Sequence, residues 1–241
     1  MEQSLTASQF AEYLSDDEIS KITPLLDRLK VLEEQKTSQD NYLKFVKKIW
    51  PTFIEGKHHK IYADKLQKVA DGKIKRLIVN MPPRHTKSEF ASYLFPAWLM
   101  GRRPDLKIIQ ATHTAELAVG FGRKVKNLID SDDFRDIFPE IKLASDAKAS
   151  GRWSTNGGGE YYAVGVGGAL AGRGADLCII DDPVSEQDAL SPTALDGIYE
   201  WYTSGPRQRL QPGGSIIIVM TRWGIKDLTA RVISKQAEGG A

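Results

Sequence analysis

The sequence predicts an α/β fold: a three-layer sandwich with a mostly parallel central sheet, preceded by a helical region. Two observations carry this prediction. After Lys73, five short apolar runs rich in β-branched residues occur, and amphipathic helical stretches separate most of them. Before Lys73, apolar residues recur at helical spacing instead. We therefore expect a helical region over residues 1–72 and the α/β core over residues 73–241, with no linker that forces a second independent domain.

The N-terminal region is expected to form several helices. The predicted helical stretches are residues 7–36, 39–50 and 61–70. Pro24 is expected to open a second helix within the first stretch, because proline is favoured in a first helical turn. Pro51 stops the helix before it, and Asp71-Gly72 ends the last one.

The core is expected to contain five strands. They are residues 76–80, 107–112, 161–166, 176–181 and 215–221. The helices expected between and after them are residues 88–100, 115–129, 194–210 and 227–236. The strand at 161–166 follows a glycine-containing segment without a helix, so we expect it to pair locally. The other strands fit a parallel sheet that is covered on both faces.

Composition excludes several classes of protein. The chain has 241 residues, of which 41% are hydrophobic and 27% charged, and its net charge is +2. Any basic surface must therefore be local. The single cysteine, Cys178, rules out an internal disulfide and favours a reducing, intracellular setting. The N-terminus lacks the pattern of a signal peptide, and the apolar runs are too short to span a bilayer, so no membrane partner is expected.

The segment RLIVNMPPRHTKSEFASYLF, residues 76–95, is typical of a strand, a tight loop and a helix. Lys87 and Ser88 supply the cation and the hydroxyl of a phosphate-binding loop, which hold phosphates and Mg²⁺. Both glycines of the usual G-x-x-x-x-G-K-[ST] pattern are missing, because Met81 and Thr86 occupy their positions.

The rest of the loop remains compatible with an anion site. Pro82 and Pro83 lack N–H groups, but residues 84–88 keep theirs, and Arg84 and His85 add positive charge. A β-turn followed by a helix N-cap, with Thr86 and Glu89 forming a capping box, explains the segment equally well.

A second signal favours the phosphate-binding interpretation. LCIIDD ends in Asp181-Asp182, so an apolar strand delivers paired carboxylates to its C-terminal end. Ligands of open α/β sheets bind at those ends, where one carboxylate holds Mg²⁺ and the next activates water. A simple Asp-Asp-Pro turn is the alternative, but it does not explain Lys87 and Ser88 at the end of another strand.

A third signal is VMTRW, residues 219–223, at the end of the last strand. Thr221 and Arg222 place a hydroxyl and a cation beside the same crevice. Such a pair can sense a γ-phosphate or pass its loss to another element. A strand-end turn with a solvated arginine is the alternative.

The motifs MPPRHTKS, GRGADLCIIDDP and VMTRW, in this order and separation, resemble the ATPase domain of the large terminase subunit of tailed bacteriophages. The resemblance covers roughly residues 42–232. It implies a P-loop NTPase fold of the additional-strand, RecA-like type, with ATP and Mg²⁺ as cofactors. It also implies a motor that packages double-stranded DNA into a prohead at the portal, in a ring of commonly five subunits, with a small terminase subunit. The setting would be the host cytoplasm, not the mature virion.

The resemblance also implies roles for single residues. Lys87 and Ser88 match the Walker A lysine and hydroxyl, with His85 and Thr86 in the same nucleotide-binding loop. Asp181 matches the Walker B aspartate, a metal ligand together with Ser88, and Asp182 takes the position of the catalytic carboxylate. It further implies Arg84 as a γ-phosphate contact, Arg173 as the candidate arginine finger acting in trans, and Thr221 and Arg222 as the coupling motif. Because His59 and Tyr62 lie upstream of the loop in the sequence, we also expect one of them to stack on adenine.

Two departures from the family pattern leave alternatives open. Many members have glutamate where this chain has Asp182, so another carboxylate such as Glu186 could assist. The family usually carries a C-terminal nuclease domain, which this sequence does not show, so no DNA cleavage is expected. An ATP-binding assembly module with little turnover, or a helicase-like DNA translocase, remains the alternative to a packaging motor.

Overall fold

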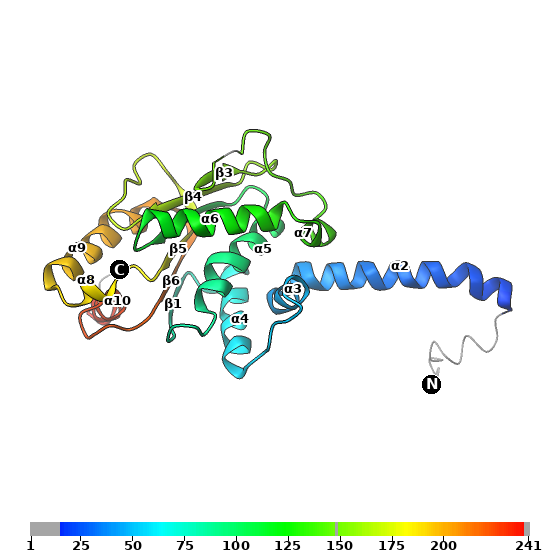
Figure 1. Ribbon diagram of the computed structural model, residues 1–241, viewed down its shortest axis with the longest axis horizontal. Coiled ribbons are helices and arrows are strands. Elements are labelled where there is room, and N and C mark those ends of the chain that lie inside the picture. The colour runs from blue at the N-terminus through cyan, green and yellow to red at the C-terminus, as the bar shows by residue number, and fades with distance from the viewer. Residues whose placement is uncertain (1–14, 148, 239–241) are drawn as a thin grey trace.

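The computed structural model describes residues 15–147 and 149–238 and contains one six-stranded sheet (Figure 1). The strands are β1 (Arg76–Asn80), β2 (Lys107–Thr112), β3 (Arg152–Ser154), β4 (Glu160–Gly165), β5 (Ala175–Asp181) and β6 (Leu210–Met220). Their spatial order is β1-β6-β5-β2-β4-β3. All neighbours pair in parallel except β3 and β4, which are antiparallel.

Helices precede the sheet and cover it. The N-terminal helices are α2 (Asp16–Asp40), α3 (Tyr42–Ile49) and α4 (Lys57–Ala70). Those of the core are α5 (Phe95–Arg102), α6 (Ala115–Ile129), α7 (Asp132–Ile137), α8 (Glu186–Ala189), α9 (Pro192–Ser204) and α10 (Leu228–Ala237), with a π-helical turn at Glu89–Leu94 and a 3₁₀ turn at Pro206–Arg209. None of the helices in the described ranges is long and apolar enough to cross a membrane.

Two apolar cores lie on opposite faces of the sheet. Alternate side chains of β6 divide between them: Ile217 and Val219 face one core, and Ile216 and Ile218 face the other. The first core includes residues of α3 to α7, and the second includes residues of α9 and α10. The protein is therefore a three-layer α/β sandwich, as the sequence predicted.

Several expected boundaries were wrong. Pro24 lies inside a continuous helix, α2, rather than opening a second one. Because Pro24 is exposed, water can solvate the carbonyl that its missing N–H leaves unpaired. Helix α4 begins at Lys57, four residues early, since Gly56 caps it and donates its N–H to Nδ1 of His59 at 2.8 Å. The start of the 7–36 helix lies outside the described residues.

The remaining differences concern short or adjoining elements. The expected helix 194–210 ends at Ser204, and β6 begins five residues before the expected position. Strand β4 pairs locally with β3, as expected, but also in parallel with β2. Strand β3, the π-helical turn and the short helices α7 and α8 were not predicted.

The sheet order positions the candidate site. Strand β6 lies between β1, which precedes the loop at residues 81–88, and β5, which ends in Asp181. All three strands run in the same direction. Their carboxyl ends therefore bring the loop, the two aspartates and Thr221-Arg222 to one edge of the sheet.

Candidate functional site

The loop between β1 and the following helix keeps the backbone shape that glycine would allow. Arg84 has φ 62° and Thr86 has φ 61°, both in the left-handed region. That conformation costs a residue with a side chain about 1–2 kcal/mol. The surrounding structure therefore holds the loop in a strained form. Thr86, at the second glycine position, thus adopts the left-handed conformation that glycine usually provides there.

The loop contains backbone hydrogen-bond donors that have no partner among the described residues. None of the backbone N–H groups from Arg84 to Ser88 donates to another described residue. The first intrahelical bond after the loop runs from Phe90 N to Thr86 O, at 3.0 Å. These free N–H groups at a helix N-terminus form the kind of cradle that binds an anion.

Two side chains of α4 form hydrogen bonds with the loop. Nε2 of His59 lies 2.7 Å from Oγ1 of Thr86, which donates to the carbonyl of His85 at 2.6 Å. Because Nδ1 of His59 accepts from Gly56 N–H, the proton of the neutral ring lies on Nε2. Burial lowers the pKa of His59, which favours this neutral form. The hydroxyl of Tyr62 donates to the carbonyl of Lys87 at 2.9 Å.

The geometry does not support His59 or Tyr62 as an adenine platform. Only 6% of His59 and 4% of Tyr62 is exposed. Both rings stack on Phe90, at centroid distances of 5.4 and 5.6 Å. A base has no open ring face to stack on, so the two residues support the loop instead. The capping box of the β-turn alternative is also not formed, since Glu89 pairs with Lys124 at 3.0 Å.

Asp181 is a buried carboxylate held by two hydroxyls of the helix after the loop. Ser88 donates to Oδ1 at 3.0 Å and Ser92 to Oδ2 at 2.6 Å. Gln110 of β2 donates to Ser92 at 3.2 Å. Burial raises the pKa of Asp181 to about 6, and the charge of Asp182 acts in the same direction. A buried carboxylate of this kind is stabilised by a bound cation.

Asp182 connects the loop with the third motif. Its Oδ2 lies 2.7 Å from Nζ of Lys87, and its Oδ1 accepts the backbone N–H of Thr221 at 2.8 Å. Lys87 is nearly buried, with 8% of its side chain exposed, while 40% of Asp182 is exposed. Asp182 also has a positive φ, 42°. The structure thus brings together the lysine, both aspartates and Thr221.

The three candidate arginines lie in different settings. Arg84 is exposed and makes no hydrogen bond or ion pair with the described residues. Arg173 places its guanidinium 3.8 Å from the centre of the Tyr162 ring, so its charge is already engaged within the chain. Nε of Arg222 pairs with Asp227 at 2.8 Å, and its Nη2 donates to Gly224 O at 3.0 Å. Glu186 is exposed at the start of α8.

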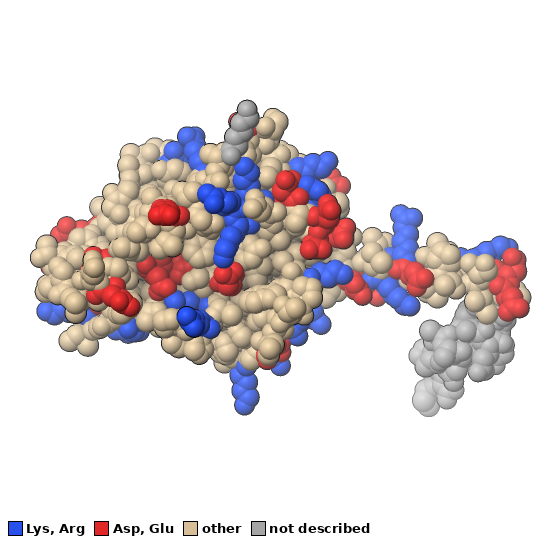
Figure 2. Space-filling view, in the orientation of Figure 1, with Lys and Arg blue, Asp and Glu red and all other residues tan. Residues whose placement is uncertain are grey.

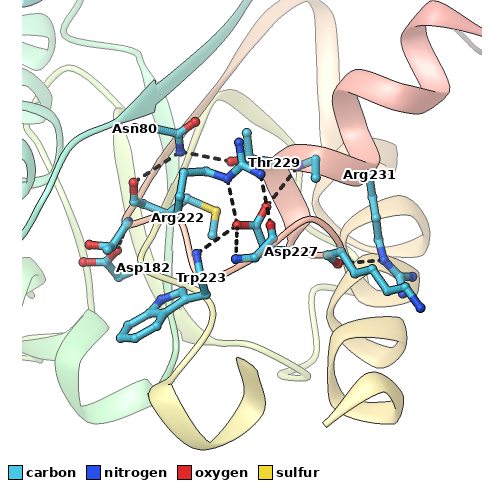
Figure 3. Close-up of polar contacts among 12 residues, drawn as sticks. Asn80, Asp182, Arg222, Trp223, Asp227, Thr229 and Arg231 are labelled. Atoms are coloured by element: carbon cyan, nitrogen blue, oxygen red, sulfur yellow. Dashed lines mark hydrogen bonds and ion pairs between the residues drawn. The ribbon is translucent and has the colours of Figure 1, made fainter. Parts of the chain in front are cut away.

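Figure 3 shows that Asp227 is the centre of this last cluster. Its side chain is 1% exposed, and it accepts N–H groups from Trp223, Gly224 and Ala230 besides Arg222. The carboxylate caps α10 and fixes the turn that follows β6. Arg222 is consequently held against α10 in this structure, while the backbone N–H of Thr221 donates to Asp182 and its hydroxyl donates to Met81 O.

The fold of the chain has a counterpart among solved structures. The fold is similar to that of the large terminase of bacteriophage HK97, with a TM-score of 0.57 and 12% sequence identity. The match covers 83% of this chain and 41% of the terminase chain, so the present chain spans less than half of that protein's length. No protein-family model and no curated protein sequence matches the chain. The similarity confirms the predicted fold class, an α/β fold with a mostly parallel central sheet and N-terminal helices.

The donor set near Asp181 fits Mg²⁺. This ion prefers oxygen ligands, keeps several waters and binds through one or two carboxylates plus substrate phosphates. Ser88, Asp181 and Asp182 supply such oxygens within one small cluster. Within the described ranges, no group of three or more His, Cys, Asp or Glu residues forms a protein-only metal cage.

Sequence reasoning missed four residues of the site. Ser92 contacts Asp181, Gln110 supports Ser92, Asn80 donates to Met220 O and Thr229, and Asp227 holds Arg222. Two of them carried a detectable signal. Ser92 follows Ser88 by four residues and so shares its helix face, and Gln110 is a polar residue within an apolar strand.

Proposed function

We propose that the chain binds ATP with Mg²⁺ and hydrolyses it, as the motor domain of a DNA-packaging terminase. One observation carries the proposal above the others. A strained loop, which contains free N–H groups and Lys87, lies at the same sheet edge as the carboxylates of Asp181 and Asp182. A capped β-turn would need neither the strain nor the buried charges.

Each residue has a role in this proposal. The N–H groups of residues 84–88 and Lys87 would bind the β- and γ-phosphates. Ser88 and Asp181 would hold Mg²⁺, which would neutralise phosphate charge. Asp182 accepts a proton from the water that attacks the γ-phosphorus. The bond to the β,γ-bridging oxygen breaks, and ADP and phosphate leave.

Lys87 has to change partners in this scheme. In the present structure it is paired with Asp182, whose second oxygen is bound by Thr221 N–H. A triphosphate that attracts Lys87 would free one oxygen of Asp182 for the attacking water. Thr221 would then report the state of Asp182 to the turn around Arg222 and Asp227.

The packaging role rests on the fold. The HK97 protein of similar fold is a large terminase, and the motifs of this chain resemble the same family. We accordingly propose double-stranded DNA as the translocated substrate and a ring of subunits at a prohead portal as the assembly, with a small terminase subunit as a partner. Arg84 in cis, or Arg173 from a neighbouring subunit, would neutralise charge on the γ-phosphate. For Arg173 this requires release from Tyr162.

Steady-state hydrolysis of ATP tests the proposal. The wild type, Lys87→Ala and Asp182→Asn are compared with and without Mg²⁺ and double-stranded DNA, over a range of protein concentration. We expect Mg²⁺-dependent turnover by the wild type only, and a rate per subunit that rises with concentration if an arginine acts in trans. Wild-type turnover no higher than that of Lys87→Ala at every concentration would exclude hydrolysis by this chain and leave a binding module.

A further inference from the structure

Helix α2 presents an apolar stripe that the rest of the described chain does not cover. Its exposed members are Ile19, Leu25, Leu26, Leu29 and Leu32, with exposed fractions of 38, 61, 49, 54 and 48%. Among the described residues, the contacts that anchor the helix lie towards its C-terminus, where Gln35 and Gln39 donate to Ile137 O and Ser38 O accepts from Trp98. Figures 1 and 2 show its N-terminal part projecting away from the body.

The stripe has the spacing of a coiled-coil seam. With Ile22 assigned to position a of a heptad, Leu25 falls at d, Leu29 at the next a and Leu32 at the next d. Leu26 lies beside this seam at position e. Pro24 falls at the outer position c, where its ring cannot obstruct a partner helix. A single exposed leucine needs no explanation, but four apolar residues at successive a and d positions predict a helical partner.

Two charged residues beside the seam indicate what that partner is. Arg28 occupies position g and Glu33 the following position e, five residues later. In a parallel, in-register pair of identical helices, g of one chain faces this e of the other. Neither residue forms an ion pair with the described residues, whereas Lys30, on the outer side, pairs with Asp27 at 3.7 Å. Arg28 of each helix can therefore pair with Glu33 of an identical helix, so the charges fit a second copy of this chain.

We infer that α2 pairs through residues 19–33 with the same helix of a second copy of this chain, parallel and in register. The stripe from Ile19 to Leu32 is about 20 Å long, too short for a tight complex by itself. Pairing is therefore reversible and depends on concentration. Because the seam ends before the anchored residues of α2, the two bodies lie at the same end of the pair.

Disulfide trapping tests the register. Cys178, the only native cysteine, is fully buried, so the wild type supplies no competing thiol. Leu29→Cys is expected to form an interchain disulfide under mild oxidation. The matched control is Val31→Cys, which is more exposed, at 65%, but lies off the seam. Equal crosslinking of the two variants would mean random collision or another orientation, and would overturn the inference.

Charge reversal tests the identity of the partner by sedimentation equilibrium of the full chain. Arg28→Glu is expected to weaken self-association about tenfold, since it opposes two glutamates in each of two symmetric pairs. The double variant Arg28→Glu/Glu33→Arg is expected to restore it. A wild type that stays monomeric up to millimolar concentration, or a double variant no better than Arg28→Glu, would overturn the inference. Unchanged thermal unfolding of the body shows that each variant is folded.

Discussion

The strain in the loop can be measured separately from the hydrogen bond that accompanies it. Thr86→Val keeps the β-branched shape and the left-handed φ of 61° but removes the hydroxyl that His59 contacts. It leaves the buried Nε2–H of His59 without a partner, which we expect to cost about 1–3 kcal/mol of unfolding free energy. Thr86→Gly removes the same hydroxyl and also releases the strain.

The difference between the two variants isolates the strain. Glycine regains about 1–2 kcal/mol by relaxing the left-handed backbone and loses about 0.5–1 kcal/mol through the greater entropy of its unfolded chain. Thr86→Gly should therefore be about 1 kcal/mol more stable than Thr86→Val in urea unfolding. Gly120→Ala, at an open helical position, serves as a control for ordinary glycine effects. If Thr86→Gly proves equal to or less stable than Thr86→Val, the backbone at Thr86 is not strained and the argument from the missing glycines fails.

Three further predictions concern the buried groups. Because burial raises the pKa of Asp181 to about 6, the folded state binds its proton more tightly than the unfolded chain. Protonation of Asp181 therefore adds about 3 kcal/mol to the free energy of unfolding. This stabilisation is fully present below about pH 4 and is lost as the pH rises through about 6. Asp181→Asn should thus stabilise the ligand-free protein at pH 8 but not at pH 4 in urea unfolding, and parallel pH profiles would contradict this. Asp227→Ala should lower the free energy of unfolding by about 2–4 kcal/mol, because it leaves Arg222 and three N–H groups unpaired. A loss of stability no larger than that caused by Asp105→Ala, at an exposed position, would contradict this. Burial also raises the pKa of Cys178 to about 12, so thiol reagents should label it only after unfolding; rapid labelling of the folded protein is the opposing result.

The strands were predictable where both faces of the sheet are buried, because such strands are apolar at almost every position. Runs such as residues 176–181 and 215–221 are apolar at almost every position because helices cover both faces of the sheet. Strand β3 has three residues and no periodicity that could reveal it. Pro24 was misjudged because the rule against proline inside helices assumes that the lost hydrogen bond goes unreplaced, and on the exposed α2 water replaces it.

The proximity of the candidate residues was predictable where the sheet topology determines it. Lys87, Asp181 and Asp182 lie together because parallel strands end at one edge, which is a consequence of topology. The contacts of His59 and Tyr62 were not predictable in this way. Their distance from the loop in the sequence is compatible with facing a ligand or supporting the loop, and only the packing on Phe90 decides between these. The positive φ of Arg84 and Thr86 was likewise invisible, because neither residue type favours it.

The most direct test of the central claim is the binding of ATP, measured by calorimetry with Mg²⁺, to the wild type and to Lys87→Ala. A loop that holds phosphates through its free N–H groups and Lys87 should give the wild type measurable affinity, and Lys87→Ala should bind at least about tenfold more weakly. Tyr62→Phe removes only the hydrogen bond to Lys87 O and leaves the Lys87 side chain intact, so it controls for effects on ATP binding that arise from changes in loop structure. Equal affinity of the wild type and Lys87→Ala, or no binding by either, would contradict the assignment of residues 81–88 as a phosphate-binding loop.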